Sequence, residues 1–326
     1  MRFSIRLNND LPADQYPQLA LAAEVAGFDQ FWVSHDLFLR SAPVILTACA
    51  LATGRIALGS CVLNPYTLHP AEIAMTAATL QEVTGGRFKL GIAAGAADFL
   101  GWVGIEQRRP LARMREVIGA LHQTFAGEPV EGWERQAYLR VPVEEPIPIY
   151  LGATSPGMLR LAGEVADGAL PLLFPPEHLA TVLPLIADGA ARAGRNPAEI
   201  DVATCIWCSV SNDRKAAEDV LKDKIAYYGH ALSDYLRNRL GLAEADLAAL
   251  EHALQQERDP KLARSLVTPD MLRIGIVGRP VELIPRLEQL VEMGARHLSF
   301  GPPLGPDPLK AIRLLGEHVL PRFRGI

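Results

Sequence analysis

The chain has 326 residues, of which 49% are hydrophobic and 21% charged, and its net charge at pH 7 is −5. A slightly acidic chain of this length has ample apolar material for a large core and no electrostatic reason to bind nucleic acid. No apolar run approaches the roughly 20 residues that a membrane span needs, and MRFSIRLNND at the N-terminus lacks a signal-peptide core. We therefore expect a cytoplasmic protein with no nucleic-acid or membrane partner.

The four cysteines, Cys49, Cys61, Cys205 and Cys208, are too few for a disulfide scaffold. The CIWC sequence at 205–208 has the spacing of a metal or redox pair, but it lies within the strand-like run VATCIWCSV. Side chains three residues apart on a strand point to opposite faces, so these two sulfurs cannot share a metal ion. The sequence predicts buried cysteines and no metal site.

Short β-rich runs alternate with helix-length segments along the whole chain, a pattern typical of parallel βα units. The expected strands are 3–7, 30–34, 56–62, 88–93, 147–152, 168–173, 201–210 and 296–301. The expected helices are 14–26, 43–53, 71–84, 110–126, 156–166, 177–194, 213–228, 280–293 and 308–319. Eight strands in one uninterrupted alternation favour an α/β fold of the (β/α)₈ TIM-barrel type over an open doubly wound sheet.

Residues 229–268 do not fit this repeat, because they are charged, rich in Ala and Leu, and helical in pattern. We interpret them as a helical insertion after the seventh strand, within a single domain that covers residues 1–326. Two interpretations of the insertion remain open. It is either an elaboration of the surface, or a lid or dimer contact beside the mouth of the barrel.

The active site of such a barrel forms from the loops at the C-terminal ends of its strands. Polar or Gly-rich residues follow five of the expected strands: Asn8 to Asp10, His35 and Asp36, Ser60 to Tyr66, GIAAGAADF at 91–99 and GATSPG at 152–157. The residue types gathered at these exits are therefore the candidates for a shared site.

Three of these exits have both a functional and a purely structural interpretation. GATSPG places hydroxyls and backbone N–H groups at a helix start, which suits a phosphate, although an ordinary capped helix has the same pattern. Gly91 and Gly95 let the backbone lie close to a flat ligand, but glycines also end strands for steric reasons. His35 can move a proton near neutral pH, with Asp36 beside it, or both can bond only to the backbone.

Five segments together resemble the bacterial luciferase-like superfamily, and most closely its F420-dependent branch, which includes methylenetetrahydromethanopterin reductase. They span nearly the whole chain in the family's order: FWVSHD (31–36), LGSCVLNPYTLHPAEIAM (58–75), GGRFKLGIAAG (85–95), YLGATSPGMLRLAGEVADG (150–168) and IGIVGRPVELIPRLEQLVEMGARHLSFGPP (274–303). The resemblance implies a barrel that binds coenzyme F420, or alternatively FMN, at the C-terminal mouth of the strands.

The resemblance also implies where the cofactor lies. It places a non-prolyl cis peptide at Cys61-Val62, with Ser60-Cys61 the neighbouring alternative, behind the cofactor ring. Its phosphate falls on Gly152 to Gly157 and its ring edge near Ala94 and Gly95. The implied cofactor-binding residues are Ser60, Cys61, Val62, Asn64, Ala94, Gly95, Gly152, Ala153, Thr154, Ser155 and Gly157. The candidate catalytic residues are His35, Asp36, Tyr66 and Asp98.

The chain departs from the family's pattern in three places. The family often has Asp-His after the second strand, where this chain has His35-Asp36. The sugar-phosphate dehydrogenase branch has a proton-handling Glu where Ala96 stands here, which argues against glucose-6-phosphate oxidation. The reductase branch tends to have an acidic residue near the end of strand 1, where this chain has Asn8 and Asn9.

The function expected from the resemblance is hydride transfer between reduced F420 and a small organic substrate, such as a pterin of the methylenetetrahydromethanopterin or folate type. One alternative is an FMN-dependent monooxygenase of the luciferase type. Another is a flavin-binding protein without turnover. Because relatives are often dimers, a homodimer is also expected.

Overall fold

The computed structural model describes residues 1–228, 232 and 234–325, in two compact units. The larger unit consists of residues 4–171 and 181–203, and the smaller unit of residues 1–3, 172–180 and 204–326. Every paired strand in either unit runs parallel to its neighbour. The protein is therefore an α/β protein with a parallel sheet, as the alternation in the sequence predicts.

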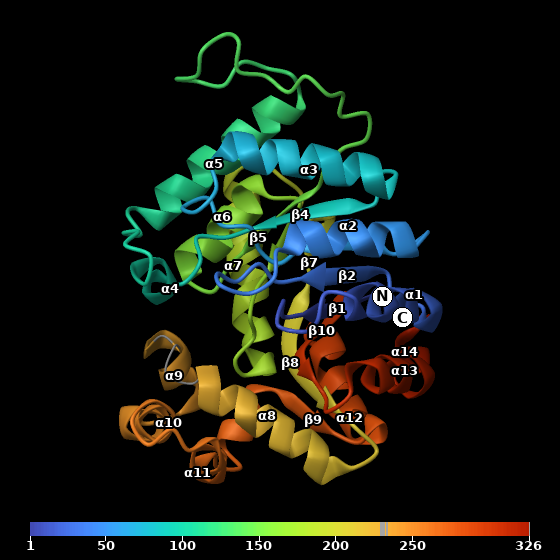
Figure 1. Cartoon of the computed structure of the whole chain (residues 1–326), viewed down its shortest axis with the longest axis vertical. Helices are drawn as coiled ribbons and strands as arrows, with labels where there is room; N and C mark the ends of the chain where they lie inside the picture. Colours follow the sequence, from blue (N-terminus) through green and yellow to red (C-terminus); the bar gives the residue numbers. More distant parts are fainter. Residues whose placement is uncertain (229–231, 233, 326) are drawn as a thin grey trace. The chain divides into compact units, whose positions relative to one another are not determined.

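The sheet of the larger unit has the strand order β7-β6-β5-β4-β3-β2-β1. Its strands are β1 (Arg2–Leu7, of which residues 4–7 belong to this unit), β2 (Gln30–Val33), β3 (Ala57–Ser60), β4 (Phe88–Ile92), β5 (Ile149–Gly152), β6 (Gly168–Leu170) and β7 (Asp201–Val202). Its helices are α1 (Gln15–Ala26), α2 (Ala42–Ala52), α3 (Pro70–Thr84), α4 (Ala97–Gly101), α5 (Pro110–Phe125), α6 (Pro156–Val165) and α7 (Leu179–Arg192, of which residues 181–192 belong to this unit). In Figure 1, α1, α2 and α3 lie side by side, and contacts join α1 to α2 and α2 to α3.

Two large aromatic side chains fill the space on one face of this sheet, and two glycines make room for them. A Cβ at Gly59 would overlap the ring of Trp32 on the neighbouring strand, and a Cβ at Gly168 would overlap the ring of Tyr150. The two rings meet edge to face with their centroids 5.0 Å apart. This pairing fixes the register between neighbouring strands, because only glycine fits beneath each ring.

The polar ends of these two rings have partners at the beginnings of the strands. Trp32 Nε1 donates to Gln30 Oε1 at 2.9 Å, and the Tyr150 hydroxyl donates to Asp201 Oδ2 at 2.7 Å. Gln30 Nε2 also donates to Asp201 Oδ2 at 3.3 Å. Asp201 therefore joins β7 to β2 and β5 at the end of the sheet opposite the strand exits.

The smaller unit contains a three-stranded parallel sheet in the order β10-β8-β9. Its strands are β8 (Thr204–Val210), β9 (Ile276–Gly278) and β10 (His297–Leu304). Its helices are α8 (Arg214–Tyr228), α9 (Asp234–Leu240), α10 (Glu244–Gln255), α11 (Pro260–Leu266), α12 (Pro280–Glu292), α13 (Pro308–His318) and α14 (Leu320–Phe323), with the 3₁₀ turns η1 (Pro176–His178) and η4 (Met271–Ile274). Phe174 and Trp207 anchor an apolar core that continues into α8, α10 and α11.

The observed elements differ from the expected ones in a few short stretches. The expected strand 201–210 is interrupted at Ala203 into β7 and β8, and the expected strand 168–173 ends at Leu170. Neither β9 nor α4 is expected from the sequence, because three and five residues are too few for a periodic pattern. Within the expected insertion, α9, α10 and α11 are helical, while residues 229–231 and 233 lie outside the described part of the chain.

In the part of the chain that the structure describes, no helix combines the length and apolar character needed to cross a bilayer.

Candidate active site

Four neighbouring strands of the larger unit end at the same edge of the sheet. Val33 of β2 lies beside Ser60 of β3, and β4 and β5 continue the parallel ladder with Ile92 beside Leu151. The segments that follow β2, β3, β4 and β5 therefore meet at one edge, as the sequence predicts for a shared site.

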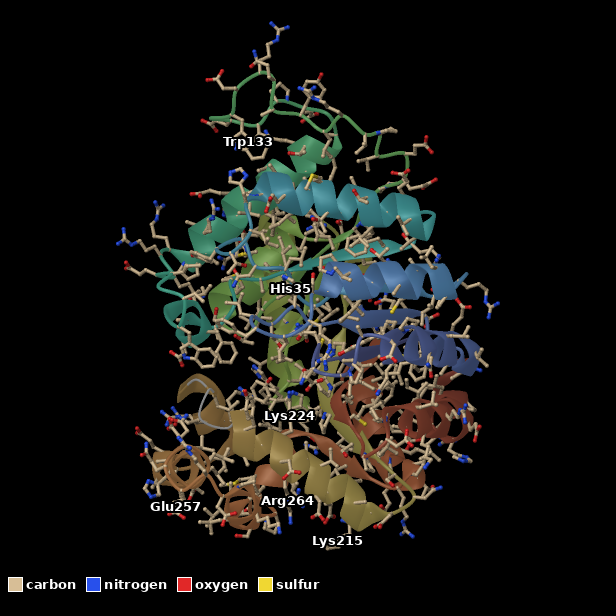
Figure 2. The ribbon with its side chains drawn as sticks, in the orientation of Figure 1. His35, Trp133, Lys215, Lys224, Glu257 and Arg264 are labelled. Carbon is tan, nitrogen blue, oxygen red and sulfur yellow. The ribbon has the colours of Figure 1, made fainter. Side chains whose placement is uncertain are left out.

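His35 lies two residues after the end of β2 and is held by the first turn of α2. Its Nδ1 accepts the backbone N–H of Ala42 at 3.1 Å, and Figure 2 shows the residue beside the beginning of that helix. An accepting Nδ1 places the ring proton on Nε2 in the neutral imidazole. Burial lowers the pKa of His35 below its ordinary value of 6.5, so the ring is neutral at pH 7. His35 can therefore offer one N–H, at Nε2, to a bound molecule.

The loop that contains Asp36 is fixed by Asn9, which lies at the end of β1 and is fully buried. The Asn9 side-chain amide donates to the carbonyl oxygens of Asp36 at 3.1 Å and Arg40 at 2.6 Å. Phe38, between these two carbonyls, has a φ of 65° and is largely exposed. Asn9 thus shapes this exit, a role that its position after a strand does not reveal.

The exit of β3 contains the cis peptide that the resemblance implies, at Cys61-Val62, so that prediction is confirmed. Ser60 just before it is fully buried, and its hydroxyl both donates to Gly91 O and accepts from Gly91 N–H, each at 3.0 Å. Both hydrogen-bonding roles of the hydroxyl are used within the protein. The only donor of the Ser60 side chain is therefore committed to the next strand and is not left for a ligand.

The glycines at the exit of β4 accommodate β3 rather than empty space. A Cβ at Gly91 would overlap the carbonyl oxygen of Ser60, and a Cβ at Gly95, whose φ is 74°, would overlap Nδ2 of Asn64. Asn64 Oδ1 in turn accepts the backbone N–H of Tyr66 at 2.9 Å. We expected these glycines to let the backbone approach a flat ligand. In the structure they let the exit of β4 approach the exit of β3.

The exit of β5 packs against the exits of β3 and β4. A Cβ at Gly152 would lie 2.9 Å from Ala93 Cβ and 3.4 Å from Val62 Cγ1. Ala153 is buried, whereas Thr154 and Ser155 are exposed. The Ser155 hydroxyl accepts the N–H of Met158 at 3.3 Å and caps α6. Gly157 and the exposed Thr154 at this helix start are the groups that remain for an anion.

Two of the candidate catalytic residues, Tyr66 and Asp98, make no described hydrogen bond to the exits of β3, β4 and β5 beyond their own segments. The hydroxyl of Tyr66 donates to the carbonyl of Arg108 at 2.5 Å, which links the β3 exit to the loop before α5. Asp98 lies in the short helix α4 and is exposed. Neither residue is brought next to His35 by a described contact.

The exits of β3, β4 and β5 thus form an uncharged wall of small residues, in which Gly152 lies against Ala93 and Val62, and Cys61 and Ala94 are their neighbours in the chain. Such a surface fits the flat face of a tricyclic ring, and the N-terminus of α6 fits a phosphate group. His35, which follows the neighbouring strand β2, supplies a neutral hydrogen-bond donor at the same edge of the sheet. The residues present therefore fit a flavin-type or deazaflavin-type cofactor.

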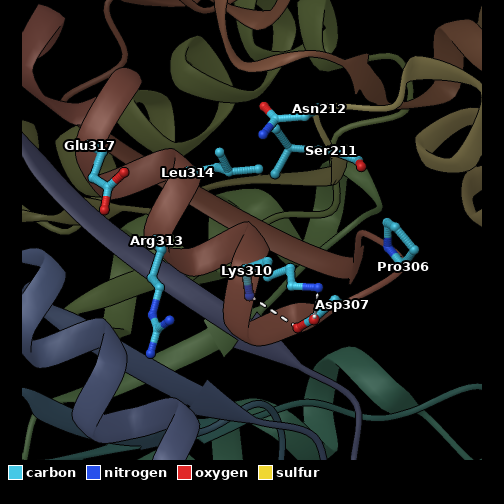
Figure 3. Close-up of a pocket in the computed structure, with 9 residues that line it drawn as sticks. Ser211, Asn212, Pro306, Asp307, Lys310, Arg313, Leu314 and Glu317 are labelled. Atoms are coloured by element: carbon cyan, nitrogen blue, oxygen red, sulfur yellow. Dashed lines mark hydrogen bonds and ion pairs between the residues drawn. The ribbon is translucent and has the colours of Figure 1, made fainter.

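The smaller unit has a separate pocket of about 380 Å³ between the end of β8 and the first turns of α13 (Figure 3). Ser211 and Asn212 form one side, and Asp307, Lys310 and Arg313 the other. Asp307 caps α13 through the N–H of Lys310 at 3.1 Å and also pairs with the Lys310 ammonium group at 3.3 Å. None of the residues predicted for the site lines this pocket.

In parallel α/β barrels the functional site lies at the C-terminal ends of the strands, which is the edge that carries the uncharged wall here. The chain belongs to the luciferase-like monooxygenase family, whose model matches residues 1–297.

Relatives with assigned activities cover essentially the whole chain. It is 32% identical over 329 residues to a 5,10-methylenetetrahydromethanopterin reductase from Methanolobus tindarius, covering 98% of this chain and 100% of that one. It is 31% identical over 348 residues to an F420-dependent glucose-6-phosphate dehydrogenase from Nakamurella multipartita, covering 99% and 97%. The coenzyme F420 dependent tetrahydromethanopterin reductase from Methanopyrus kandleri superposes with a TM-score of 0.89 at 30% identity, covering 99% of both chains.

Proposed function

We propose that this protein is an F420-dependent oxidoreductase that transfers a hydride between reduced F420 and a small organic substrate, with a pterin of the methylenetetrahydromethanopterin or folate type as the proposed example. The observation that carries the proposal is the full-length similarity to two groups of enzymes that differ in substrate but are both described as F420-dependent. The uncharged wall at the exits of β3, β4 and β5 supports it, because it fits a flat ring.

In this proposal Cys61, Val62, Ala94 and Gly95 hold the ring. The segment 152–157 holds the phosphate end: Thr154 and Gly157 supply the donors, and Gly152, Ala153 and the helix-capping Ser155 shape the turn around it. When bound, F420 supplies the carbon that carries the hydride. The protein contributes the placement of the substrate against the exposed face of the ring, which is the larger part of catalysis when the chemistry belongs to the cofactor. Asn64 and Tyr66 shape the side of the site next to the ring edge.

His35 is the proposed residue that hydrogen-bonds to the substrate, because its neutral ring keeps an Nε2–H donor while Nδ1 is bonded to Ala42. Asp36 fixes the loop through its backbone. Asp98, the carboxylate nearest in sequence to the Gly-rich turn, is a second proposed residue, and its exposure makes it reachable from solvent.

Binding of the purified protein to F420 and to FMN, measured side by side as dissociation constants, tests the proposed cofactor. We expect F420 to bind at least about tenfold more tightly, a difference of about 1.4 kcal/mol. Tight FMN binding without F420 binding would overturn the proposal in favour of a luciferase-type monooxygenase. Oxygen consumption coupled to hydroxylation would then be the decisive assay.

The substrate class is tested separately, with reduced F420 and either a methylene-tetrahydropterin or a methylene-tetrahydrofolate, followed by the absorbance of the oxidised cofactor. The reverse assay with oxidised F420 and glucose 6-phosphate is the comparison, because Ala96 stands where that branch has a Glu. Cofactor binding with no turnover of any acceptor would support the non-catalytic flavin-binding alternative.

Four further features belong to the same proposal. We infer that the chain is one domain whose strands close into an eight-stranded barrel, and that residues 229–268 form a helical insertion in it. The superposition with the M. kandleri reductase supports the barrel. A cytoplasmic location is proposed from the sequence and can be checked by fractionation. The last feature is a homodimer.

The outer faces of α1 and α2 support the proposed homodimer. Val25, Val44 and Leu51 are 76%, 68% and 80% exposed on these neighbouring helices. The only charged residue in either helix is Glu24, whose carboxylate accepts the backbone N–H groups of residues 54–56. In a two-fold interface each face meets a copy of itself, so a charge-free apolar face avoids pairing like charges.

A further inference from the structure

The loop before α5 contains a glutamine that bonds to the turn after β4. Gln107 Nε2 donates to the carbonyl oxygens of both Ala94 and Gly95, each at 2.9 Å. Successive carbonyls of an extended strand point in opposite directions. The left-handed φ of 74° at Gly95 turns the next peptide so that both carbonyls reach one nitrogen. Gln107 therefore bonds specifically to the turned form of this exit.

This loop and the first turn of α5 are attached to the exit of β3 at two more points. The Tyr66 hydroxyl donates to Arg108 O at 2.5 Å, and Arg113 Nη2 donates to Pro65 O at 3.2 Å. We call residues 105–113 the strap. The strap, the β3 exit and the β4 exit are thus joined by four hydrogen bonds. Asn64 completes the arrangement, since its side chain fills the space beside the Cα of Gly95.

We propose that Gln107 is a positioning residue for the cofactor: by bonding to the Ala94 and Gly95 carbonyls it holds the turn in the shape that receives the ring edge. This inference rests on the proposed function, which places the ring edge at Ala94 and Gly95. Gln107 acts through the turn and not by touching the reacting atoms. Without it, two carbonyls would lose their donor, and the turn would be held only from the Asn64 side.

Two substitutions separate the hydrogen bonds from the bulk of the side chain. Gln107→Ala removes both, and Gln107→Glu keeps the shape but puts a carboxylate against two carbonyl oxygens. We expect each variant to weaken F420 binding by about tenfold or more at pH 8, as expected for two lost hydrogen bonds. Gln136→Ala is the control, because Gln136 is exposed and only its backbone carbonyl makes a described hydrogen bond.

The pH dependence of binding distinguishes positioning from general damage. A protonated carboxyl at position 107 can donate one hydrogen bond, and nearby carbonyl oxygens favour the protonated form. The affinity of Gln107→Glu should therefore recover severalfold, relative to wild type, between about pH 8 and about pH 5. Gln107→Ala should show no such recovery. Equal affinities of wild type and both variants at every pH would overturn the proposal.

A measurement without cofactor keeps this inference separate from the proposed function. Trypsin can cut the strap after Arg108, whereas the bond after Arg109 is blocked by Pro110. We expect cleavage at Arg108 to be faster in Gln107→Ala than in wild type or Gln136→Ala, with no change in melting temperature beyond a few degrees. Unchanged cleavage would overturn the inference. If wild type fails to bind F420, the proposed function is wrong, whatever the cleavage rate.

Discussion

The side-chain amide nitrogen of Asn64 occupies the space that a Cβ at Gly95 would need. The two residues come from the exits of adjacent strands, and Gly95 has a φ of 74°. Two independent constraints, one steric and one conformational, therefore require glycine at position 95.

Gly95→Ala should consequently weaken cofactor binding and lower the free energy of unfolding by about 1–3 kcal/mol. The measurements are urea denaturation and the dissociation constant for F420. Gly119→Ala in α5 is the control, because a Cβ there meets no atom within 4 Å, and alanine in a helix should be neutral or stabilising. A Gly95→Ala variant as stable as Gly119→Ala would contradict the steric argument.

Most of the fold could be predicted because its signals are local. Short apolar runs alternating with helix-length segments marked β1 to β6 to within about three residues at each end, and the exits of these strands followed from them. β9 and α4 were missed because neither is long enough to show a period. The break at Ala203 arises because β7 pairs with β6 whereas β8 pairs with β10. The residues of the strand itself do not reveal these partners.

The candidate site was only partly predictable, because the type of a residue does not reveal which group on another strand it bonds to or packs against. Ser60 looked like a ligand contact, but its hydroxyl bonds to Gly91 on the next strand. The absence of a side chain at Gly95 suggested space for a ligand, but the Asn64 side chain fills that space. Gln107 lies in a loop without periodicity, and its role depends on the path by which that loop returns to the β4 exit.

The contact of Tyr150 with Asp201 gives a prediction about stability. Tyr150→Phe removes a 2.7 Å hydrogen bond and leaves a buried carboxylate with one partner fewer. We expect the free energy of unfolding to fall by about 1–3 kcal/mol, measured by urea denaturation. Tyr138→Phe, on an exposed part of the 127–148 segment that Figure 2 shows around Trp133, is the matched change and should have little effect. Equal losses in both variants would indicate that the buried hydrogen bond is not the cause.

The proposed homodimer predicts that a charge on α2 separates the protomers. Val44→Arg places two like charges across the two-fold axis, and we expect the molecular mass in light scattering to fall to that of a monomer. Val281→Arg is an unusually close control, because Val281 on α12 is also 68% exposed. Wild type that is already monomeric, or Val44→Arg that remains a dimer, would rule out this interface.

His178 predicts a loss of stability in acid. Burial, and secondarily the charge of Arg239, lowers the pKa of His178 from 6.5 to about 4. Between these values the unfolded chain binds a proton that the folded chain does not, so stability is full above pH 6.5 and falls as the pH drops toward 4. His178→Gln should show a shallower fall in melting temperature over that range than wild type or His318→Gln, which alters an exposed histidine. Parallel curves for all three proteins would remove His178 as the cause.

His35 gives the most direct test of the proposed chemistry. His35→Asn keeps a side-chain acceptor for the Ala42 N–H, but its NH₂ group is too short to reach the position of Nε2, so the loop should persist while the donor at that position is lost. We expect kcat to fall by about 10²-fold, with a small change in cofactor affinity and in melting temperature. Because burial lowers the pKa of His35, the wild-type rate should be constant through neutral pH and decline only below about pH 6.5, as the ring gains its second proton. If His35→Asn keeps the full rate and this same acid limb, the imidazole serves only to hold the beginning of α2, and the hydrogen-bond donor to the substrate lies elsewhere in the site.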